Sequence, residues 1–236
     1  MLNKKPRVLA ITLARGGSKS VPKKNIRKIN GFPLIAYTIM EALKSKYITR
    51  YIVSTDDKEI KKVSEKYGAE VPFLRPKNLA SDKASSVSAL QHAVQWIEKN
   101  EGEKYDYIIE LMCTNPLKNY IDIDACIKKL IKTNADSVIA VHQLEDHHPA
   151  RIKKIINDKI VDFCVVEKNE SRRQDLKPKA YVRSGSIYAL KRNHLMLENK
   201  RYGSVNSRPF ILPSEKAINI DTEADLIIAK YKLNND

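Results

Sequence analysis

A segment near the N-terminus combines glycines with basic side chains in a pattern suited to holding phosphate groups. It runs Ala14-Arg-Gly-Gly-Ser-Lys-Ser-Val-Pro-Lys-Lys-Asn25 and directly follows an apolar stretch. From Arg15 to Lys28 there are six basic residues and no acidic one. Glycines such as Gly16 and Gly17 let backbone N–H groups approach phosphate oxygens closely, and arginine and lysine neutralise a polyphosphate. The segment therefore predicts binding of a nucleoside triphosphate.

The same basic residues could instead form a solvated loop or part of a nucleic-acid-binding surface. The segment lacks the glycine spacing of a P-loop and of a dinucleotide site, so a solvated basic loop without a ligand stays open as an alternative. The formal net charge of +15 also raises the question of nucleic-acid binding. The lysines are scattered through the helical segments, and we find no helix-turn-helix and no aromatic-interleaved binding motif. Nucleic-acid binding as the primary function is therefore disfavoured.

Short β-branched runs alternate with helical patterns along the chain. Strands are predicted at Val8 to Ala14, Tyr51 to Thr55, Tyr107 to Met112, Ser137 to Val141 and Ser186 to Leu190. Apolar residues recur at helical spacing between most of them, and the chain ends on a helix that begins near Asp221. This alternation predicts an α/β protein with a Rossmann-like, mostly parallel sheet covered by helices. The chemistry is expected at the carboxyl ends of the strands.

The rhythm breaks between about residues 143 and 182. Two strands are predicted there, Arg151 to Ile156 and Ile160 to Glu167, and Asn157-Asp158 between them predicts a hairpin turn. A hairpin that leaves an α/β sheet has to bury one face, and a partner subunit is a common solution. We therefore expect one α/β domain over residues 1–236, with a dimerisation excursion at about 143–182, and a homodimer.

Several segments together resemble the acylneuraminate cytidylyltransferases, the family of the CMP-sialic acid synthetases and their relatives that activate legionaminic, pseudaminic and similar ulosonic acids. The signature ARGGSKxxPxKN after a first strand is typical of this family. Further similar segments, in the family's order, are Ser54-Thr-Asp-Asp57, Arg75-Pro with Leu79-Ala-Ser-Asp82 and Ser85-Ser86, Thr114-Asn-Pro116, Arg172-Arg-Gln174, Ser184-Gly-Ser-Ile-Tyr188 and Ile220-Asp-Thr-Glu-Ala-Asp225. The resemblance covers most of the chain. It implies a nucleotide-sugar transferase type of fold and the reaction of CTP with an acidic nine-carbon sugar to give a CMP-sugar and pyrophosphate.

The resemblance also implies roles for residues at the nucleotide end. It assigns Arg15 and Lys24 to the triphosphate, with Lys19 near the reacting end, and Gly16 and Gly17 to the loop around it. It assigns Asn25 and Arg75 to the cytosine, with Ser81 able to complete the pocket. Cytosine offers acceptors at O2 and N3 and a donor at N4, which suit an amide and a guanidinium. Without the family pattern, Asn25 as a turn residue and Arg75 as a surface charge remain alternatives.

At the other end, the resemblance makes Asp221 the ligand of Mg²⁺, for which Mn²⁺ could substitute. The alternative role of Asp221 is the N-cap of the last helix. Arg173 resembles the family's arginine that contacts the acidic sugar, and it is expected near or in the neighbouring subunit's site. Met112 and Thr114 are expected at the acceptor end. No histidine–carboxylate pair stands out as a general base.

Departures from the family pattern fall at the acceptor and metal end. Met112 stands where sialic-acid enzymes usually have glutamine, Asn219 where they usually have aspartate, and Ser184 where they usually have asparagine. CTP is therefore better supported than N-acetylneuraminate. Two other functions stay open: nucleotidyl transfer to a different acceptor, such as a phosphorylated sugar, and a non-catalytic basic protein that binds nucleotides or nucleic acid.

The spacing of the cysteines and the hydropathy of the chain indicate which covalent, metal and membrane features to expect. The three cysteines are far apart, without a C-x-x-C pair or a histidine at ligand spacing, so neither a disulfide framework nor a zinc site is predicted. No run of about 18 apolar residues occurs, and the N-terminal stretch has no cleavage signal. We expect a cytoplasmic protein without membrane contact.

Overall fold

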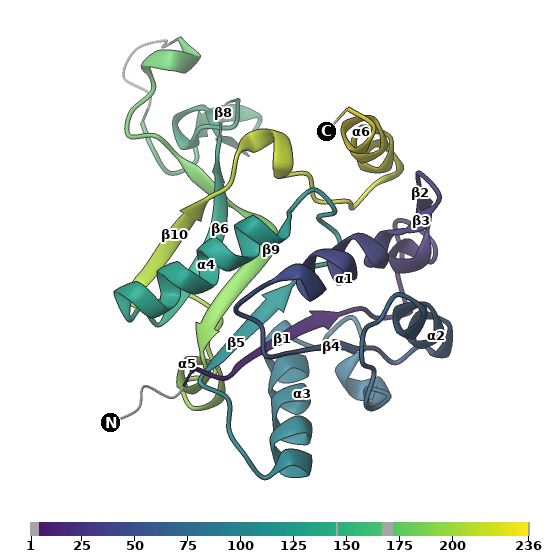
Figure 1. The fold of residues 1–236 in the computed structure, drawn as a ribbon. Coiled ribbons are helices and arrows are strands. Elements are labelled where there is room, and N and C mark those ends of the chain that lie inside the picture. Colours follow the sequence, from purple (N-terminus) through teal and green to yellow (C-terminus); the bar gives the residue numbers. More distant parts are fainter. Residues whose placement is uncertain (1–4, 145, 167–171, 236) are drawn as a thin grey trace.

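A single six-stranded sheet organises the computed structural model, which describes residues 5–144, 146–166 and 172–235 (Figure 1). The strands follow the order β10-β6-β9-β5-β1-β4. Their bounds are β1 Val8–Leu13, β4 Arg50–Ser54, β5 Tyr107–Leu111, β6 Ser137–Gln143, β9 Tyr181–Lys191 and β10 Ser207–Ile211. Strand β9 is antiparallel to β5 and β6, and the other neighbouring pairs are parallel. The predicted mostly parallel sheet is confirmed.

Helices cover both faces of this sheet, as Figure 1 shows. Their bounds are α1 Leu34–Lys44, α2 Lys58–Lys66, α3 Ser86–Glu101, α4 Tyr120–Thr133, α5 Arg192–Met196 and α6 Glu223–Leu233. Helices α1, α2 and α4 pack on one face, and α3 and α5 pack on the other. Because its two faces are both covered, β1 is a continuous apolar run whose residues from Val8 to Ile11 are fully buried.

The last helix packs apart from the two sheet faces, against the basic segment. A third apolar cluster joins Leu226 and Ala229 of α6, with Ile220 before it, to Val21 and Leu34. Short strands β2 (Lys28–Ile29) and β3 (Phe32–Pro33) form an antiparallel pair beside it. This packing brings residues 219–221 next to the N-terminal segment, although almost the whole chain separates them.

Side-chain caps fix where the helices begin. Asp57 caps α2, accepting hydrogen bonds from the backbone N–H groups of residues 59 and 60. Thr222 caps α6 in a capping box with Asp225. The alternative prediction of Asp221 as this N-cap is therefore wrong, because Asp221 lies one residue earlier and its carboxylate contacts other groups.

A separate hairpin stands off the end of the sheet. It consists of β7 (Lys153–Ile156) and β8 (Lys159–Asp162), which pair antiparallel. Asn157 and Asp158 both have positive φ, 50° and 59°, as a tight hairpin turn requires. Its apolar side chains face outward: Ile155 is 77% exposed and Ile160 is 76% exposed. The predicted hairpin is confirmed with shorter strands, and the predicted end of the second strand at Glu167 lies outside the described residues.

Several features of the fold were not predicted. The short strands β2 and β3, strand β10 and the short helix α5 were missed, and β9 begins at Tyr181 rather than at Ser186. Within the ranges that the structure describes, the helices are too short or too polar to span a membrane.

Candidate active site

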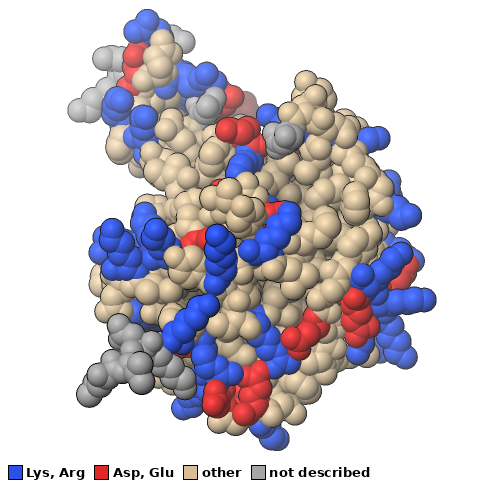
Figure 2. Space-filling model, viewed as in Figure 1, with Lys and Arg blue, Asp and Glu red and all other residues tan. Residues whose placement is uncertain are grey.

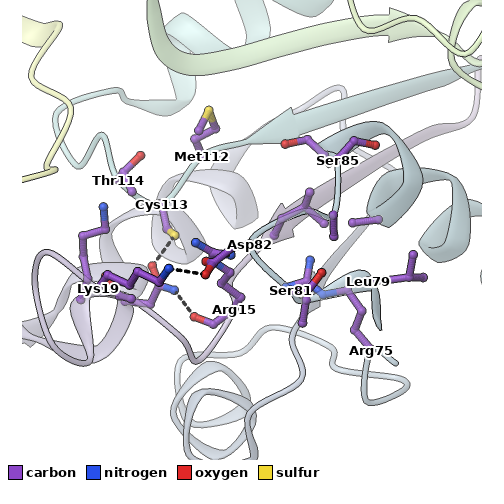
Figure 3. Close-up of a pocket in the computed structure, with 18 of the residues that line it drawn as sticks. Arg15, Lys19, Arg75, Leu79, Ser81, Asp82, Ser85, Met112, Cys113 and Thr114 are labelled. Carbon is purple, nitrogen blue, oxygen red and sulfur yellow. Dashed lines mark hydrogen bonds and ion pairs between the residues drawn. The ribbon is translucent and has the colours of Figure 1, made fainter. Parts of the chain in front are cut away.

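A cavity of about 460 Å³ opens beyond the carboxyl ends of β1 and β5 (Figure 3). This is the edge where an open α/β sheet binds ligands. Most of the predicted site residues line it: Arg15, Lys19, Lys24, Asn25, Arg75, Ser81, Met112, Thr114, Asn219 and Asp221. The fold therefore gathers the nucleotide end, the metal end and most of the acceptor end into one place.

Arg15 and Lys19 share one carboxylate at the cavity. Arg15 Nη1 lies 2.9 Å from Asp82 Oδ1, and Lys19 Nζ lies 2.5 Å from Asp82 Oδ2. Figure 3 shows the Lys19 side chain reaching toward Asp82. The two cations lower the pKa of Asp82, with the hydrogen bond from Lys19 as the largest cause. Asp82 belongs to the segment Leu79-Ala-Ser-Asp82, and its residue type alone predicted no role for it.

Lys24 connects the basic segment to the C-terminal segment. Its Nζ donates to the backbone carbonyl of Ile220 at 2.7 Å and to Asp221 Oδ1 at 2.9 Å. The second oxygen of Asp221 accepts a hydrogen bond from Asn219 Nδ2. Asn219 thus presents its nitrogen to Asp221, and its Oδ1 is buried without a hydrogen-bond partner among the described residues. The predicted phosphate ligand and the predicted metal ligand are in direct contact.

Arg75 is held inside the protein with few acceptors around it. Its side chain is 3% exposed, its Nη2 lies 3.9 Å from Asp56 Oδ1, and its buried Nε has no partner among the described residues. Burial lowers the pKa of Arg75. Buried donors normally find acceptors, so this guanidinium is suited to a ligand that brings its own. The alternative of a surface charge is wrong.

Asn25 has structural contacts in addition to its place on the cavity. Its Nδ2 donates to the backbone carbonyl of Arg15 at 2.9 Å, and its Oδ1 accepts from Cys113 Sγ at 3.1 Å. It lies in a short 3₁₀ turn, Lys24–Ile26, rather than in an exposed loop. The amide therefore ties the basic segment to the end of β5, with one N–H hydrogen left over. Contact between Asn25 and cytosine stays a prediction.

The two glycines differ in what surrounds them. The N–H of Gly16 donates to Asp56 Oδ1 at 3.0 Å, and a β-carbon there would lie 2.7 Å from Asp57 Oδ2. Gly16 is thus required by close packing, and its N–H is already used. Around Gly17 a β-carbon would meet nothing within 4 Å. Of the pair, Gly17 is the one with open space beside it.

The acceptor end differs from expectation in two ways. Arg173 does not line this cavity. It borders a smaller cavity, which is lined by residues of the segment 143–180, and its Nη1 lies 3.3 Å from Asp146 Oδ1. Glu110, which was not predicted, lines the main cavity.

Two predicted hydroxyl side chains differ in their contacts. Thr114 Oγ1 is buried without a partner among the described residues, and Ser81 Oγ donates to the carbonyl of Asn78.

Lys118 supports the segment behind the cavity. It is 1% exposed, and its Nζ lies 2.7 Å from each of three acceptors: Thr38 Oγ1 and the backbone carbonyls of Met112 and Asn115. Burial lowers the pKa of Lys118 to about 7. The sequence shows only a lysine after Pro116-Leu117, and nothing in that pattern distinguishes a buried lysine from a surface one.

The residues present fit a magnesium ion that is also bound by phosphates. The described residues contain no cluster of three His, Cys, Asp or Glu that could enclose a metal. Mg²⁺, however, is usually held by one or two carboxylates together with substrate phosphates and water. Asp221 would supply one such carboxylate, beside Lys24 in the lining of the cavity.

Charge on the molecule is consistent with a small anionic ligand. Figure 2 shows Lys and Arg at several places on this face, many of them next to Asp or Glu, rather than in one continuous basic stripe. With its cavity at the carboxyl ends of the strands, the chain is an open-sheet α/β protein of the kind that binds its ligand at that edge.

Comparison with known proteins gives the family. Residues 9–226 match the model of the family described as cytidylyltransferase. The chain is 38% identical over 231 residues to a pseudaminic acid cytidylyltransferase of Campylobacter jejuni, with 97% of each chain covered. It is 34% identical over 227 residues to a CMP-N,N'-diacetyllegionaminic acid synthase of Campylobacter jejuni, covering 96% of this chain and 95% of the relative. The chain therefore belongs to the cytidylyltransferase family, as the sequence motifs predicted.

Solved structures support the same fold. A CMP:2-keto-3-deoxy-manno-octonic acid synthetase complexed with CTP superposes with a TM-score of 0.73 at 18% sequence identity, covering 97% of this chain and 99% of that one. At this identity the likeness establishes the α/β fold.

Proposed function

We propose that the protein transfers the cytidylyl group of CTP to an acidic nine-carbon sugar of the ulosonic type, with release of pyrophosphate. The observation that carries the proposal is the composition of the cavity. It is lined by the buried guanidinium of Arg75, whose Nε has no acceptor among the described residues, and by the basic side chains of Arg15, Lys19 and Lys24. A pyrimidine base with acceptors and an attached triphosphate would satisfy both.

The reaction requires in-line displacement at the α-phosphorus. The anomeric hydroxyl oxygen of the sugar forms a bond to the α-phosphorus, the bond from this phosphorus to the bridging oxygen breaks, the hydroxyl proton passes to water, and pyrophosphate leaves. Arg15 and Lys24 would hold the triphosphate, with Lys19 near its reacting end. Asp221 would hold Mg²⁺, which neutralises charge on the phosphates when it is bound.

The class of acceptor is inferred from the names of relatives and from one departure from the family pattern. The relatives carry names that refer to pseudaminic and N,N'-diacetyllegionaminic acid. Met112 cannot form the hydrogen bonds of the glutamine that sialic-acid enzymes usually have. We therefore expect a di-N-acylated ulosonic acid to be a better acceptor than N-acetylneuraminic acid.

Pyrophosphate release from the purified protein tests the proposal. The assay pairs CTP, UTP or ATP with pseudaminic, N,N'-diacetyllegionaminic or N-acetylneuraminic acid in the presence of Mg²⁺. We expect turnover with CTP and at least one of the di-N-acylated acids. The absence of turnover with every acid would refute the proposed function, and equal use of the three nucleotides would refute the assignment of the base site.

The metal assignment has its own test. Asp221→Ala should lower kcat by roughly 100-fold or more, because an anchor of the charge-neutralising ion is lost. Metal-free CTP binding should change little, since Arg15 and Lys24 remain. Glu223→Ala, two residues away and outside the cavity lining, is the matched control. Asn219→Asp should lower the Mg²⁺ concentration for half-maximal rate. Full activity of Asp221→Ala would refute the metal site.

We also propose that the protein is a homodimer that uses the hairpin β7–β8. The outward isoleucines of the hairpin support this, because an apolar hairpin of two strands is marginal unless another surface covers it. Arg173 would then reach the neighbouring subunit's cavity, where its guanidinium suits the acceptor's carboxylate. Cytoplasmic localisation stays a prediction.

A further inference from the structure

Glu110 is a buried acid in an otherwise apolar strand. Strand β5 has the sequence YIIEL, and Glu110 is 2% exposed. It lies on the same sheet face as Ile108 and Met112, two residues away on either side. Despite its burial it contributes to the lining of the main cavity, together with Met112, Ser85 and Ser86. The small area that it exposes therefore belongs to the site.

A set of stacked side chains holds this carboxylate in place. Arg201 Nη1 donates to Glu110 Oε2 at 2.6 Å, and the Arg201 guanidinium lies 4.2 Å from the ring centroid of Tyr188. Tyr188 is also the cross-strand neighbour of Glu110 in β9. On the far side, Arg183 stacks at 4.3 Å on Tyr202, whose ring centroid lies 6.4 Å from that of Tyr188. Glu110 is thus preorganised rather than mobile.

Stability alone does not explain such a pair. A buried ion pair often stabilises a fold no better than apolar residues of the same volume, because both charges lose their hydration. Burial raises the pKa of Glu110, and Arg201 opposes that rise. The arginine engages Oε2, and no described residue donates a hydrogen bond to Oε1. One oxygen of a fixed carboxylate therefore remains available at the cavity.

We propose that Glu110 is a specificity-determining residue for the acceptor, accepting a hydrogen bond from one of its O–H or amide N–H groups. This inference rests on the proposed function. It follows because Glu110 lies on the same sheet face as Met112, the residue expected at the acceptor end, and lines the same cavity.

Two single substitutions and their combination separate recognition from structural support. Glu110→Gln removes the charge and keeps the shape. Arg201→Gln breaks the same ion pair but keeps the carboxylate, so it is the matched control. The double variant leaves no unpaired buried charge, so it remains informative where a single variant folds poorly. The measurements are the KM values for CTP and for the best di-N-acylated acid, and the Tm of each variant.

We expect every variant with Glu110→Gln to raise the acceptor KM about tenfold, because a charged acceptor forms a stronger hydrogen bond than a neutral one. The KM for CTP should stay within about twofold, as the base and phosphate contacts are intact. Arg201→Gln should lower Tm with a smaller effect on acceptor KM. Equal acceptor effects of the two single variants, or none from Glu110→Gln, would refute the role of Glu110. A wild-type protein inactive with all acids would instead refute the proposed function, and this inference with it.

Discussion

Arg75 is the residue whose surroundings most directly suggest what it binds. Its guanidinium is buried, and its Nε has no partner among the described residues. Removing this side chain should therefore weaken CTP binding and reduce selectivity for the base together. We predict that Arg75→Ala raises the KM for CTP roughly tenfold or more and reduces the preference for CTP over UTP. Steady-state kinetics with both nucleotides checks this. Arg208→Ala, at an exposed position on β10, is the control, and an unchanged CTP to UTP ratio in Arg75→Ala would contradict the assignment.

Asp82 forms ion pairs with two cationic side chains that a triphosphate would also need. Its carboxylate contacts both Arg15 and Lys19, so the nucleotide has to displace it from them or share them with it. Exposed ion pairs contribute little, so Asp82→Asn should tighten metal-free CTP binding only modestly, by roughly 2-fold to 10-fold. Calorimetric titration at low and high salt measures this, and the gain should shrink with salt. Weaker binding by Asp82→Asn would mean that Asp82 positions the cations for the ligand instead.

Site residues that are charged and belong to a family motif could be predicted from the sequence, whereas the residues that contact them mostly could not. The basic segment, Arg75 and Asp221 could be predicted because their types and order resemble a known family. Glu110 could not, because an isolated acid in an apolar strand has no pattern, and its partner Arg201 is far along the chain. The internal contacts of Asn25 were equally hidden, since they depend on Cys113 packing against it.

Among the elements, the hairpin β7–β8 carries the clearest expectation about assembly. If its isoleucines are covered by a second copy, charge placed there should prevent association. We predict that Ile155→Glu with Ile160→Glu converts a dimer to a monomer and removes most acceptor turnover, because Arg173 is then separated from the neighbouring cavity. Light scattering measures the mass, and Lys154→Glu on the same hairpin is the control for added charge. A wild-type monomer at working concentration would contradict the proposal.

Most elements could be predicted from local patterns, and those missed depend on tertiary contacts. Strands β1, β4 and β5 are apolar runs buried on both faces, which periodicity identifies. Strand β10 has the sequence SRPFI and includes a proline, which argues against a central strand; it is tolerated because β10 is at the edge of the sheet. The N-terminal part of β9 is polar and exposed, and it is a strand because it pairs with β6.

At the scale of the whole molecule, Lys118 couples global stability to pH. Its pKa is lowered to about 7 in the folded protein from an ordinary value of 10.5. Between these two values the unfolded chain binds the extra proton, so the free energy of unfolding rises with pH. Full burial without a carboxylate partner is the cause, and the neutral amine is the form that the fold favours.

We predict that stability increases by on the order of 1–2 kcal/mol between pH 7 and pH 8.5 from this group alone. The window ends below 9.0, the ordinary pKa of a thiol, above which the unfolded chain would lose the Cys113 proton; because burial raises the pKa of Cys113 to about 11 in the folded protein, stability would fall with pH beyond this window. Denaturant unfolding of the wild type and of Lys118→Met measures it. The variant should lose this dependence on pH, whatever its absolute stability, and an identical slope in both proteins would contradict the prediction.

The contact between Lys24 and Asp221, 197 residues apart, has a consequence for biosynthesis. A ribosome releases the N-terminal segment first, so a nascent chain acquires the residues proposed to bind the phosphates and the base long before the Asp221 carboxylate emerges. A chain that stops before residue 219 could not complete the proposed metal site. It would also leave Val21, Ile29 and Leu34 without the apolar cover of α6, and exposed apolar surface of this kind is what proteases and chaperones recognise. Completion of the proposed metal site and protection from degradation would thus depend on the same last stretch of translation.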